Sequence, residues 1–154
     1  MNRYQKALRW AGTRSWFGGF GRYVLTPIDK LLRGRSKSLT TFGTDFPMGY
    51  LTTLGRRTGL PRTVPLLYVV PAGAVAAIVG TNFGRPEHPL WVANLESEPE
   101  AVWRVDENVE VTARAATAVE HRALWTQFIA VWPGYEGYVA RSQRQPMMFI
   151  LERR

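Results

Sequence analysis

The sequence contains no cysteine and only two histidines among its 154 residues. Without cysteine the chain can form no disulfide, no thiol nucleophile and no zinc–thiolate site. The two histidines, His88 and His121, fit neither an HExxH pair nor a compact imidazole cluster. We therefore expect no structural or catalytic metal.

Several enzyme motifs are missing as well. There is no GxSxG elbow and no GxxxxGK[ST] loop, and Gly19 and Gly21 lack the third glycine of a dinucleotide fingerprint. These absences argue against serine hydrolases, P-loop NTPases and Rossmann dehydrogenases. The acidic residues between positions 96 and 110 are spaced as on a solvated face, so glycosidase chemistry has no support.

Acidic side chains are scarce in the first part of the chain. Residues 1–62 carry 12 basic and 2 acidic side chains (+10), whereas residues 63–154 carry 8 and 10 (−2), which together give the net charge of +8. This asymmetry predicts an anionic partner for the N-terminal part. Nucleic acid, a membrane surface and a polyanionic small molecule all satisfy it.

Residues 63–84 carry no charge at all. Pro71 and Gly73 interrupt this stretch, so it predicts two short strands, TVPLLYVV and AVAAIVG, rather than a membrane-spanning helix. Both strands are apolar on both faces, and we expect them in the core. The chain is therefore expected to be cytoplasmic.

The basic segment of residues 2–35 has helical spacing, with a second helix around residues 27–32. It predicts either a helix packed on the domain or an interfacial anchor that holds the protein at the inner face of the cell membrane. Further elements follow from periodicity and from proline and glycine breaks: strands at 38–42, 48–54, 101–105, 110–116 and 147–152, and helices at 88–95, 117–132 and 134–142.

Six or seven strands, mostly joined by hairpins and flanked by helices, predict an α+β fold built on a small β-barrel. Alternating βαβ units are missing, which argues against a Rossmann sheet. We expect two parts, a basic helical segment at residues 1–36 and the barrel at residues 37–154.

The strongest local pattern is LTTLGRRTGLPRTVPL, residues 51–66. A strand ends there, two glycines bend the chain, and Arg56, Arg57 and Arg62 come together with the Thr58 hydroxyl and turn amides. Several charge-assisted donors around one point suit a phosphate or a carboxylate. The alternative is an exposed basic hairpin loop without a ligand.

This segment resembles the TTxGRxSGxxRxxPL signature of the deazaflavin-dependent nitroreductase family, whose members bind coenzyme F420 in a split β-barrel. HPLWVANLESEPEAV, residues 88–102, resembles a second signature of that family, NPxWxxNLxAxPxV. The late aromatic cluster WPGYEGY, residues 132–138, resembles a third feature. The likeness covers about residues 48–151.

The resemblance implies a role for particular positions. The side of the site that binds coenzyme F420 comprises Arg56, Arg57, Thr58, Gly59, Arg62, Pro65, Leu66, Val79, Gly80, Thr81, Asn82, Leu90, Trp91 and Asn94. The acceptor side comprises Leu67, Trp132, Tyr135 and Tyr138, and the residues that can polarise the acceptor are Thr81, Tyr135 and Tyr138. Some relatives carry lysine at position 82 and tyrosine at position 67, so this chain has one fewer tail contact and a more apolar acceptor side.

The resemblance implies an F420-dependent oxidoreductase that transfers a hydride between C5 of the deazaflavin and a small planar hydrophobic acceptor: a quinone, an enone or a nitroaromatic. Three alternatives stay open: an FMN oxidoreductase on the same barrel, a carrier of cofactor or lipid without catalysis, and a nucleic-acid-binding module. The aromatics lie late in the chain, away from most arginines, which argues against nucleic acid.

Overall fold

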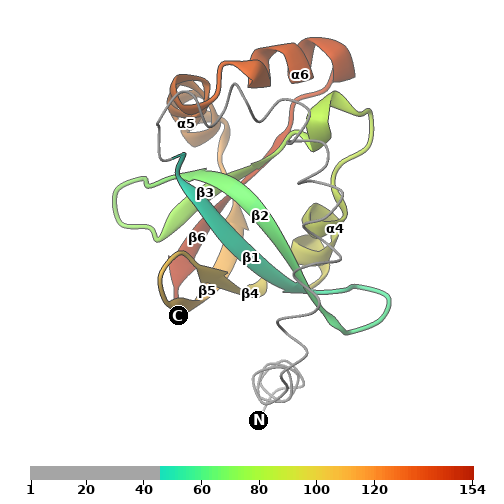
Figure 1. Cartoon of the computed structure of the whole chain (residues 1–154), viewed down its shortest axis with the longest axis vertical. Coiled ribbons are helices and arrows are strands. Elements are labelled where there is room, and N and C mark those ends of the chain that lie inside the picture. The colour runs from blue at the N-terminus through green and yellow to red at the C-terminus, as the bar shows by residue number, and fades with distance from the viewer. Residues whose placement is uncertain (1–45) are drawn as a thin grey trace. The chain divides into compact units, whose positions relative to one another are not determined.

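A computed structural model describes residues 46–154, and residues 47–154 form one compact unit. Its strands and helices are seen in Figure 1. They are β1 (Met48–Leu54), β2 (Pro61–Val69), β3 (Ala76–Gly80), the 3-10 turn η1 (Asn82–Gly84), α4 (Leu90–Ser97), β4 (Glu100–Arg104), β5 (Asn108–Ala115), α5 (Ala118–Val131), α6 (Gly134–Ser142) and β6 (Met147–Arg153).

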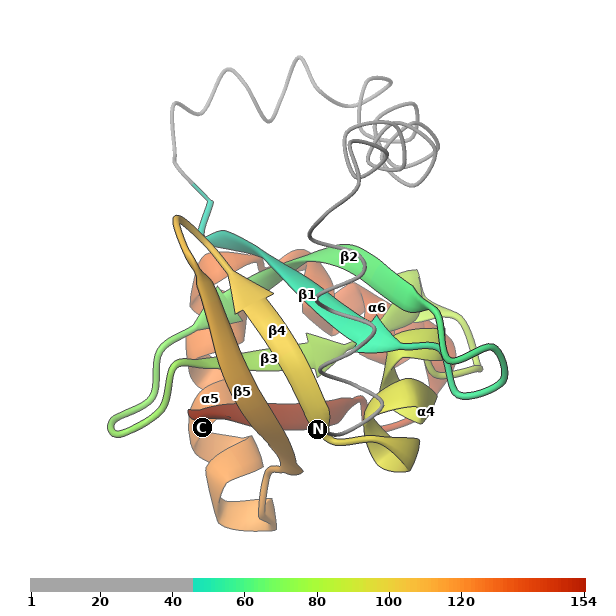
Figure 2. The same cartoon turned by 90° about the horizontal axis from the view of Figure 1, so that it is seen from below.

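The six strands close into an antiparallel barrel in the order β1-β2-β3-β6-β5-β4. Strand β1 closes it by pairing with β2 on one side and with β4 on the other, where Leu51 faces Trp103. Figure 2 shows the strands crossing around a common centre. The structure thus confirms the expected α+β barrel and its mostly hairpin connections.

Two apolar clusters account for the strands that lack polar residues. The interior cluster fills the barrel: Leu51, Ala76, Ile78, Trp91, Val92, Leu95, Ala101, Trp103, Val111, Ala113, Phe149 and Leu151. The helix-side cluster lies under α5 and α6: Val69, Ala77, Val79, Leu124, Phe128, Tyr135, Met148 and Ile150. Because side chains alternate across a strand, β3 and β6 contribute to both clusters. Both faces of these strands are therefore buried.

Strand β2 differs from the expectation that both of its faces are core. Only Val69 is buried, and most of the strand is half-buried. Leu66 packs against the interior cluster, whereas its neighbour Leu67 packs against the helix-side cluster. Within residues 46–154 the helices cover only the Leu67–Val69 end of the strand's outer face, which is why the prediction was wrong for the rest.

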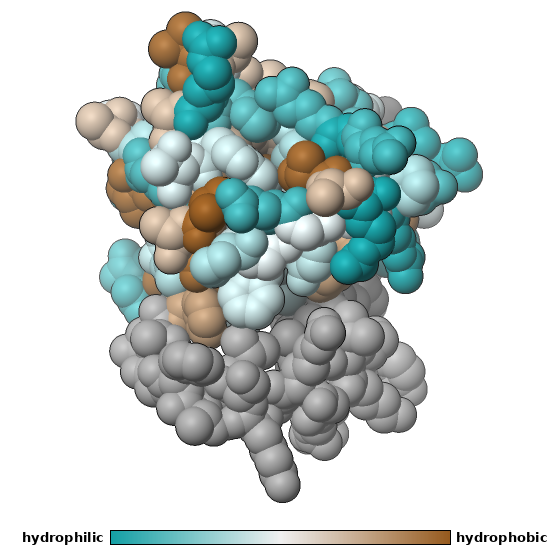
Figure 3. All heavy atoms as spheres, turned by 90° about the horizontal axis from the view of Figure 1, so that it is seen from above, coloured by the Kyte–Doolittle hydropathy of each residue, from teal (hydrophilic) through white to brown (hydrophobic). Residues whose placement is uncertain are grey.

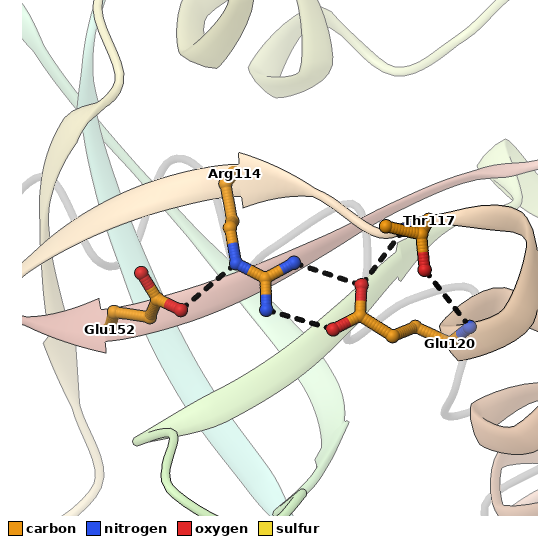
Figure 4. Close-up of polar contacts among 4 residues, drawn as sticks. All are labelled: Arg114, Thr117, Glu120 and Glu152. Carbon is orange, nitrogen blue, oxygen red and sulfur yellow. Dashed lines mark hydrogen bonds and ion pairs between the residues drawn. The ribbon is translucent and has the colours of Figure 1, made fainter.

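Helix α5 begins with the predicted capping box. The Thr117 hydroxyl accepts from the Glu120 amide, and the Glu120 carboxylate accepts from the Thr117 amide at 2.8 Å (Figure 4). Arg114 on β5 donates to Glu120 through both terminal nitrogens and to Glu152 on β6. The Arg114 guanidinium lowers the pKa of Glu120 to about 2. These contacts tie the first turn of α5 to the barrel wall.

The expected basic segment 1–36, its helices at 2–35 and 27–32, and the strand at 38–42 lie outside the described residues, so they stay predictions. So do the boundary at residue 36 and the membrane contact. Between residues 46 and 154, none of the helices has the length and apolar character needed to cross a membrane.

Candidate functional site

The basic turn, residues 55–62, joins β1 to β2 and is closed by its own backbone. Gly55 donates to the Leu60 carbonyl at 2.8 Å, and Gly59 donates to the Gly55 carbonyl at 2.7 Å. Gly59 has φ +66°, a conformation that favours glycine. A Cβ on Gly55 would lie 2.7 Å from the Thr58 hydroxyl, so a larger residue there would require the Thr58 side chain to rotate away.

The three arginines of the basic turn, Arg56, Arg57 and Arg62, are exposed. Within residues 46–154 none of them forms an ion pair, whereas Arg114 and Arg154 are bound to glutamates. A guanidinium without a carboxylate partner keeps its full set of donors for a ligand. The turn therefore presents three cations suited to phosphate or carboxylate groups.

Asn94 connects the basic turn to helix α4. Its Oδ1 accepts from the Arg56 amide at 3.0 Å, and its Nδ2 donates to the Thr53 hydroxyl at 3.0 Å. Both Asn94 and Thr53 are buried. Asn94 thus ties the start of the basic turn and the end of β1 to α4.

The connection from β3 to α4, residues 80–88, holds another group of predicted residues. Thr81 is buried, and Asn82 donates from its side chain to the Glu87 carbonyl at 2.8 Å. Asn82 and Phe83 have φ values of +48° and +56°, which non-glycine residues seldom adopt. A Cβ on Gly80 would lie 2.9 Å from Val92 Cγ2, so α4 packs directly on this strand end.

Arg144, which follows α6, reaches into the same connection and was missed by the sequence analysis. It donates to the carbonyls of Gly80, Thr81 and Glu87 at 3.1 Å each. It also contacts His88 Nδ1 at 3.1 Å, and because guanidinium only donates, that nitrogen must be the acceptor. Burial, followed by the charge of Arg144, lowers the pKa of His88. The Arg144 Nε also donates to the Arg85 carbonyl at 3.3 Å. No motif could have found Arg144, because four of its partners are backbone carbonyls.

The acceptor-side residues gather in one place. Leu67, Trp132 and Tyr138 pack against the helix-side cluster, which contains Tyr135. The rings of Tyr135 and Tyr138 meet edge to face at 6.0 Å, and Tyr138 meets Phe83 at 6.1 Å. Burial raises the pKa of Tyr135 further above its ordinary value, so its hydroxyl is an even weaker acid than a tyrosine in water. All four residues predicted to face the acceptor thus belong to one apolar cluster or pack against it, and their role at an acceptor stays a prediction.

Other predicted cofactor residues are dispersed. Trp91 lies in the interior cluster with its ring edge to face with Phe149 at 5.9 Å, so packing accounts for it. Leu66 faces the barrel interior, Val79 lies under the helices, and Pro65 is half-buried on β2. Leu90 is 80% exposed at the start of α4.

The surface near α5 and α6 is mixed in character. Seen from above, hydrophobic atoms form separate patches among hydrophilic ones (Figure 3). Phe83, next to Tyr138, is 47% exposed. Among residues 46–154 there is no group of three potential metal ligands.

Known proteins match this chain in sequence and in structure. Residues 32–153 match the family described as F420H2-dependent quinone reductase. The structure of an F420-H2 dependent reductase, FDR-A, is 30% identical, with a TM-score of 0.63 over 69% of this chain and 94% of its own. A domain-swapped dimer is 29% identical, with a TM-score of 0.63 over 82% of this chain and 99% of its own. A heme binding protein from Mycobacterium smegmatis shares the fold alone. It is 16% identical, with a TM-score of 0.54 over 70% of this chain and 46% of its own.

Proposed function

This chain belongs to the F420H2-dependent quinone reductase family, and we propose that it passes a hydride from reduced coenzyme F420 to a planar hydrophobic acceptor. It is an F420H2-dependent reductase, and its cofactor is coenzyme F420. One observation carries the proposal: the same barrel holds a turn of exposed arginines that pair with no carboxylate of residues 46–154, and a cluster of tyrosines and tryptophan.

The basic turn fits the cofactor by its chemistry. Coenzyme F420 carries a phosphodiester and a tail of glutamates, so it needs several cationic donors in one place. Arg56, Arg57 and Arg62 supply them, since no carboxylate among residues 46–154 competes for these guanidinium groups. Asn94 holds the Arg56 amide and so orients the turn toward its ligand.

When bound in its reduced form, the deazaflavin supplies a hydride from C5, which is two electrons and one proton. Reduction of a quinone to its hydroquinone needs one further proton. Tyr138 is half-buried, and its hydroxyl can hydrogen-bond to an acceptor oxygen and pass that further proton to it, after which solvent reprotonates the tyrosine. Burial raises the pKa of Tyr135, which makes it a poorer proton donor than Tyr138, and its ring packs edge to face against the Tyr138 ring.

The acceptor follows from the apolar character of the helix-side cluster. Leu67 and Trp132 pack there and offer no charge to a substrate. Flat aromatic surfaces of this kind favour a planar hydrophobic molecule. A quinone fits best, with an enone or a nitroaromatic as chemically related acceptors.

The test is a titration of the purified chain with coenzyme F420, followed by turnover of its reduced form with a soluble naphthoquinone. We expect saturable binding and quinone-dependent oxidation of the cofactor. Tyr138→Phe should lower kcat about 10-fold and leave the cofactor Kd unchanged, because it removes one proton donor. Tyr50→Phe is the matched control, since Tyr50 lies on β1 under Arg104.

Other results would replace the proposal by one of its rivals. Tighter binding of FMN than of coenzyme F420 would make the chain a flavin enzyme. Binding without quinone-dependent oxidation would make it a carrier. Steeply salt-dependent binding of DNA without binding of coenzyme F420 would indicate a nucleic-acid module.

A further inference from the structure

We propose that Arg144 is a positioning residue that holds residues 80–88 in the conformation presenting Thr81 and Asn82 to the cofactor. This inference rests on the proposed function for its effect on the cofactor. Its structural basis is a single guanidinium bound along almost the whole β3–α4 connection.

All five N–H groups of Arg144 are used by this connection. Nε donates to the Arg85 carbonyl at 3.3 Å. Nη1 is shared between the Gly80 carbonyl and His88 Nδ1, and Nη2 between the carbonyls of Thr81 and Glu87, all at 3.1 Å. A guanidinium has five donors, so none is left for an anionic ligand. Arg144 therefore acts through the connection and does not contact the cofactor.

The backbone conformation of this connection needs stabilising contacts from another part of the chain. Asn82, Phe83 and Gly84 follow one another with positive φ values of +48°, +56° and +79°. Its own backbone supplies few hydrogen bonds, from Gly84 to the Thr81 carbonyl and from Arg85 to the Asn82 carbonyl, both at 3.1 Å. Two non-glycine residues in the left-handed region persist only where surrounding contacts impose them.

Arg144 also links the two sides of the site. Helix α6, which carries Tyr135 and Tyr138, ends at Ser142, and η1 packs against it (Figure 1). Arg141 on the last turn of α6 donates to the Phe83 carbonyl at 3.2 Å. The Phe83 ring in turn meets Tyr138. Together with these contacts, the hydrogen bonds from Arg144 to the connection fix where Thr81 and Asn82 lie relative to Tyr135 and Tyr138.

Arg144→Lys is the informative variant, because lysine keeps the charge but has three donors on one atom and cannot span five acceptors. Arg144→Gln is a second variant that removes the charge. The matched control is Arg122→Lys, since Arg122 is an exposed arginine on α5. For each variant we would measure hydrogen–deuterium exchange without cofactor, the Kd for coenzyme F420, and KM and kcat.

We expect at least 10-fold faster amide exchange confined to residues 81–88 in Arg144→Lys, and wild-type exchange in α5 and β6. The Kd and KM for the cofactor should rise at least 10-fold, whereas kcat at saturating cofactor should change less than 3-fold. Added methylguanidinium should restore part of the affinity of Arg144→Gln. Arg122→Lys should match the wild type throughout.

Unchanged exchange in residues 81–88, or unchanged cofactor affinity beside faster exchange, would overturn the positioning role. Exchange that rises equally over the whole barrel would also overturn it, because Arg144 would then serve global stability. If the wild-type chain does not bind coenzyme F420, the proposed function fails. The exchange of residues 81–88 then still decides whether Arg144 holds the connection.

Discussion

Two arginine-bearing regions of this barrel use the same side chain in opposite ways. The basic turn, residues 55–62, is closed by its own backbone, and its arginines extend into solvent. The β3–α4 connection, residues 80–88, closes only in part, and Arg144 binds four of its carbonyls. The guanidinium groups of the basic turn therefore stay available to a ligand, whereas that of Arg144 is occupied by backbone carbonyls.

The sharpest test of this difference is a matched pair of glycines, one in each region. Gly59 has φ +66° with open space around its missing Cβ, whereas a Cβ on Gly84 would lie 3.1 Å from both Cα and O of Tyr138. Gly59→Ala should cost about 1 kcal/mol of unfolding free energy from its conformation alone. Gly84→Ala should cost about 3 kcal/mol, because backbone atoms of α6 cannot move aside. Urea unfolding measures both, and equal costs would contradict a tightly braced connection.

The next test removes two exposed arginines of the basic turn. The double variant Arg56→Ala, Arg57→Ala should weaken binding of coenzyme F420 about 50-fold, since two charge-assisted hydrogen bonds are lost in an exposed site. The unfolding free energy should change by less than about 0.5 kcal/mol, because neither side chain has an ion pair in the described barrel.

Fluorescence titration gives the affinity of this double variant, and Arg122→Ala with Arg153→Ala is a control of equal charge on exposed residues of α5 and β6. An equal loss of affinity in both double variants would mean that only net charge matters.

The link between the basic turn and the barrel gives a third test. Asn94→Ala leaves the Arg56 amide and the buried Thr53 hydroxyl without their partner. We expect a loss of about 2 kcal/mol in unfolding free energy, with weaker cofactor binding as the turn loosens. Urea unfolding and cofactor titration measure the two effects. Asn108→Ala, at an exposed position that begins β5, should change neither.

The smallest expected effect is a pH dependence of the stability that the His88–Arg144 hydrogen bond contributes. His88 accepts from Arg144 only when Nδ1 is unprotonated, and its pKa in the folded chain is lowered by burial and by Arg144. Its contribution is therefore present above about pH 6.5 and is lost as the pH falls through the lowered pKa. Because His88 is an exposed residue and its ring is only slightly shielded from water, we expect less than about 0.5 kcal/mol.

His88→Gln keeps an acceptor that does not titrate, so thermal unfolding between pH 7.5 and pH 5 should be flatter for this variant than for the wild type. Identical curves would show that protonation of His88 does not affect how Arg144 holds the connection.

Much of the barrel could be predicted because its signals are local. Thr117 and Glu120 stand at the spacing of a capping box, and Pro133 marks the end of α5, so that helix was placed within a residue. Pro71 and Gly73 separated the two apolar strands correctly. For the candidate site, the residue pattern pointed to the basic turn, and the family resemblance pointed to the aromatic group. Neither could show that Trp91 fills the barrel interior or that Leu66 and Leu67 belong to different clusters.

Residue order alone was enough to place the strands and helices of the barrel, the concentration of positive charge and the mixture of donors in the basic turn. Only the folded structure distinguishes the exposed arginines of the basic turn, which a ligand can reach, from Arg144, whose guanidinium binds backbone carbonyls. The reason is physical: every residue carries a backbone carbonyl, so the sequence does not show which carbonyls accept hydrogen bonds from Arg144. Only the approach of residues 80–88 to the end of α6 reveals them.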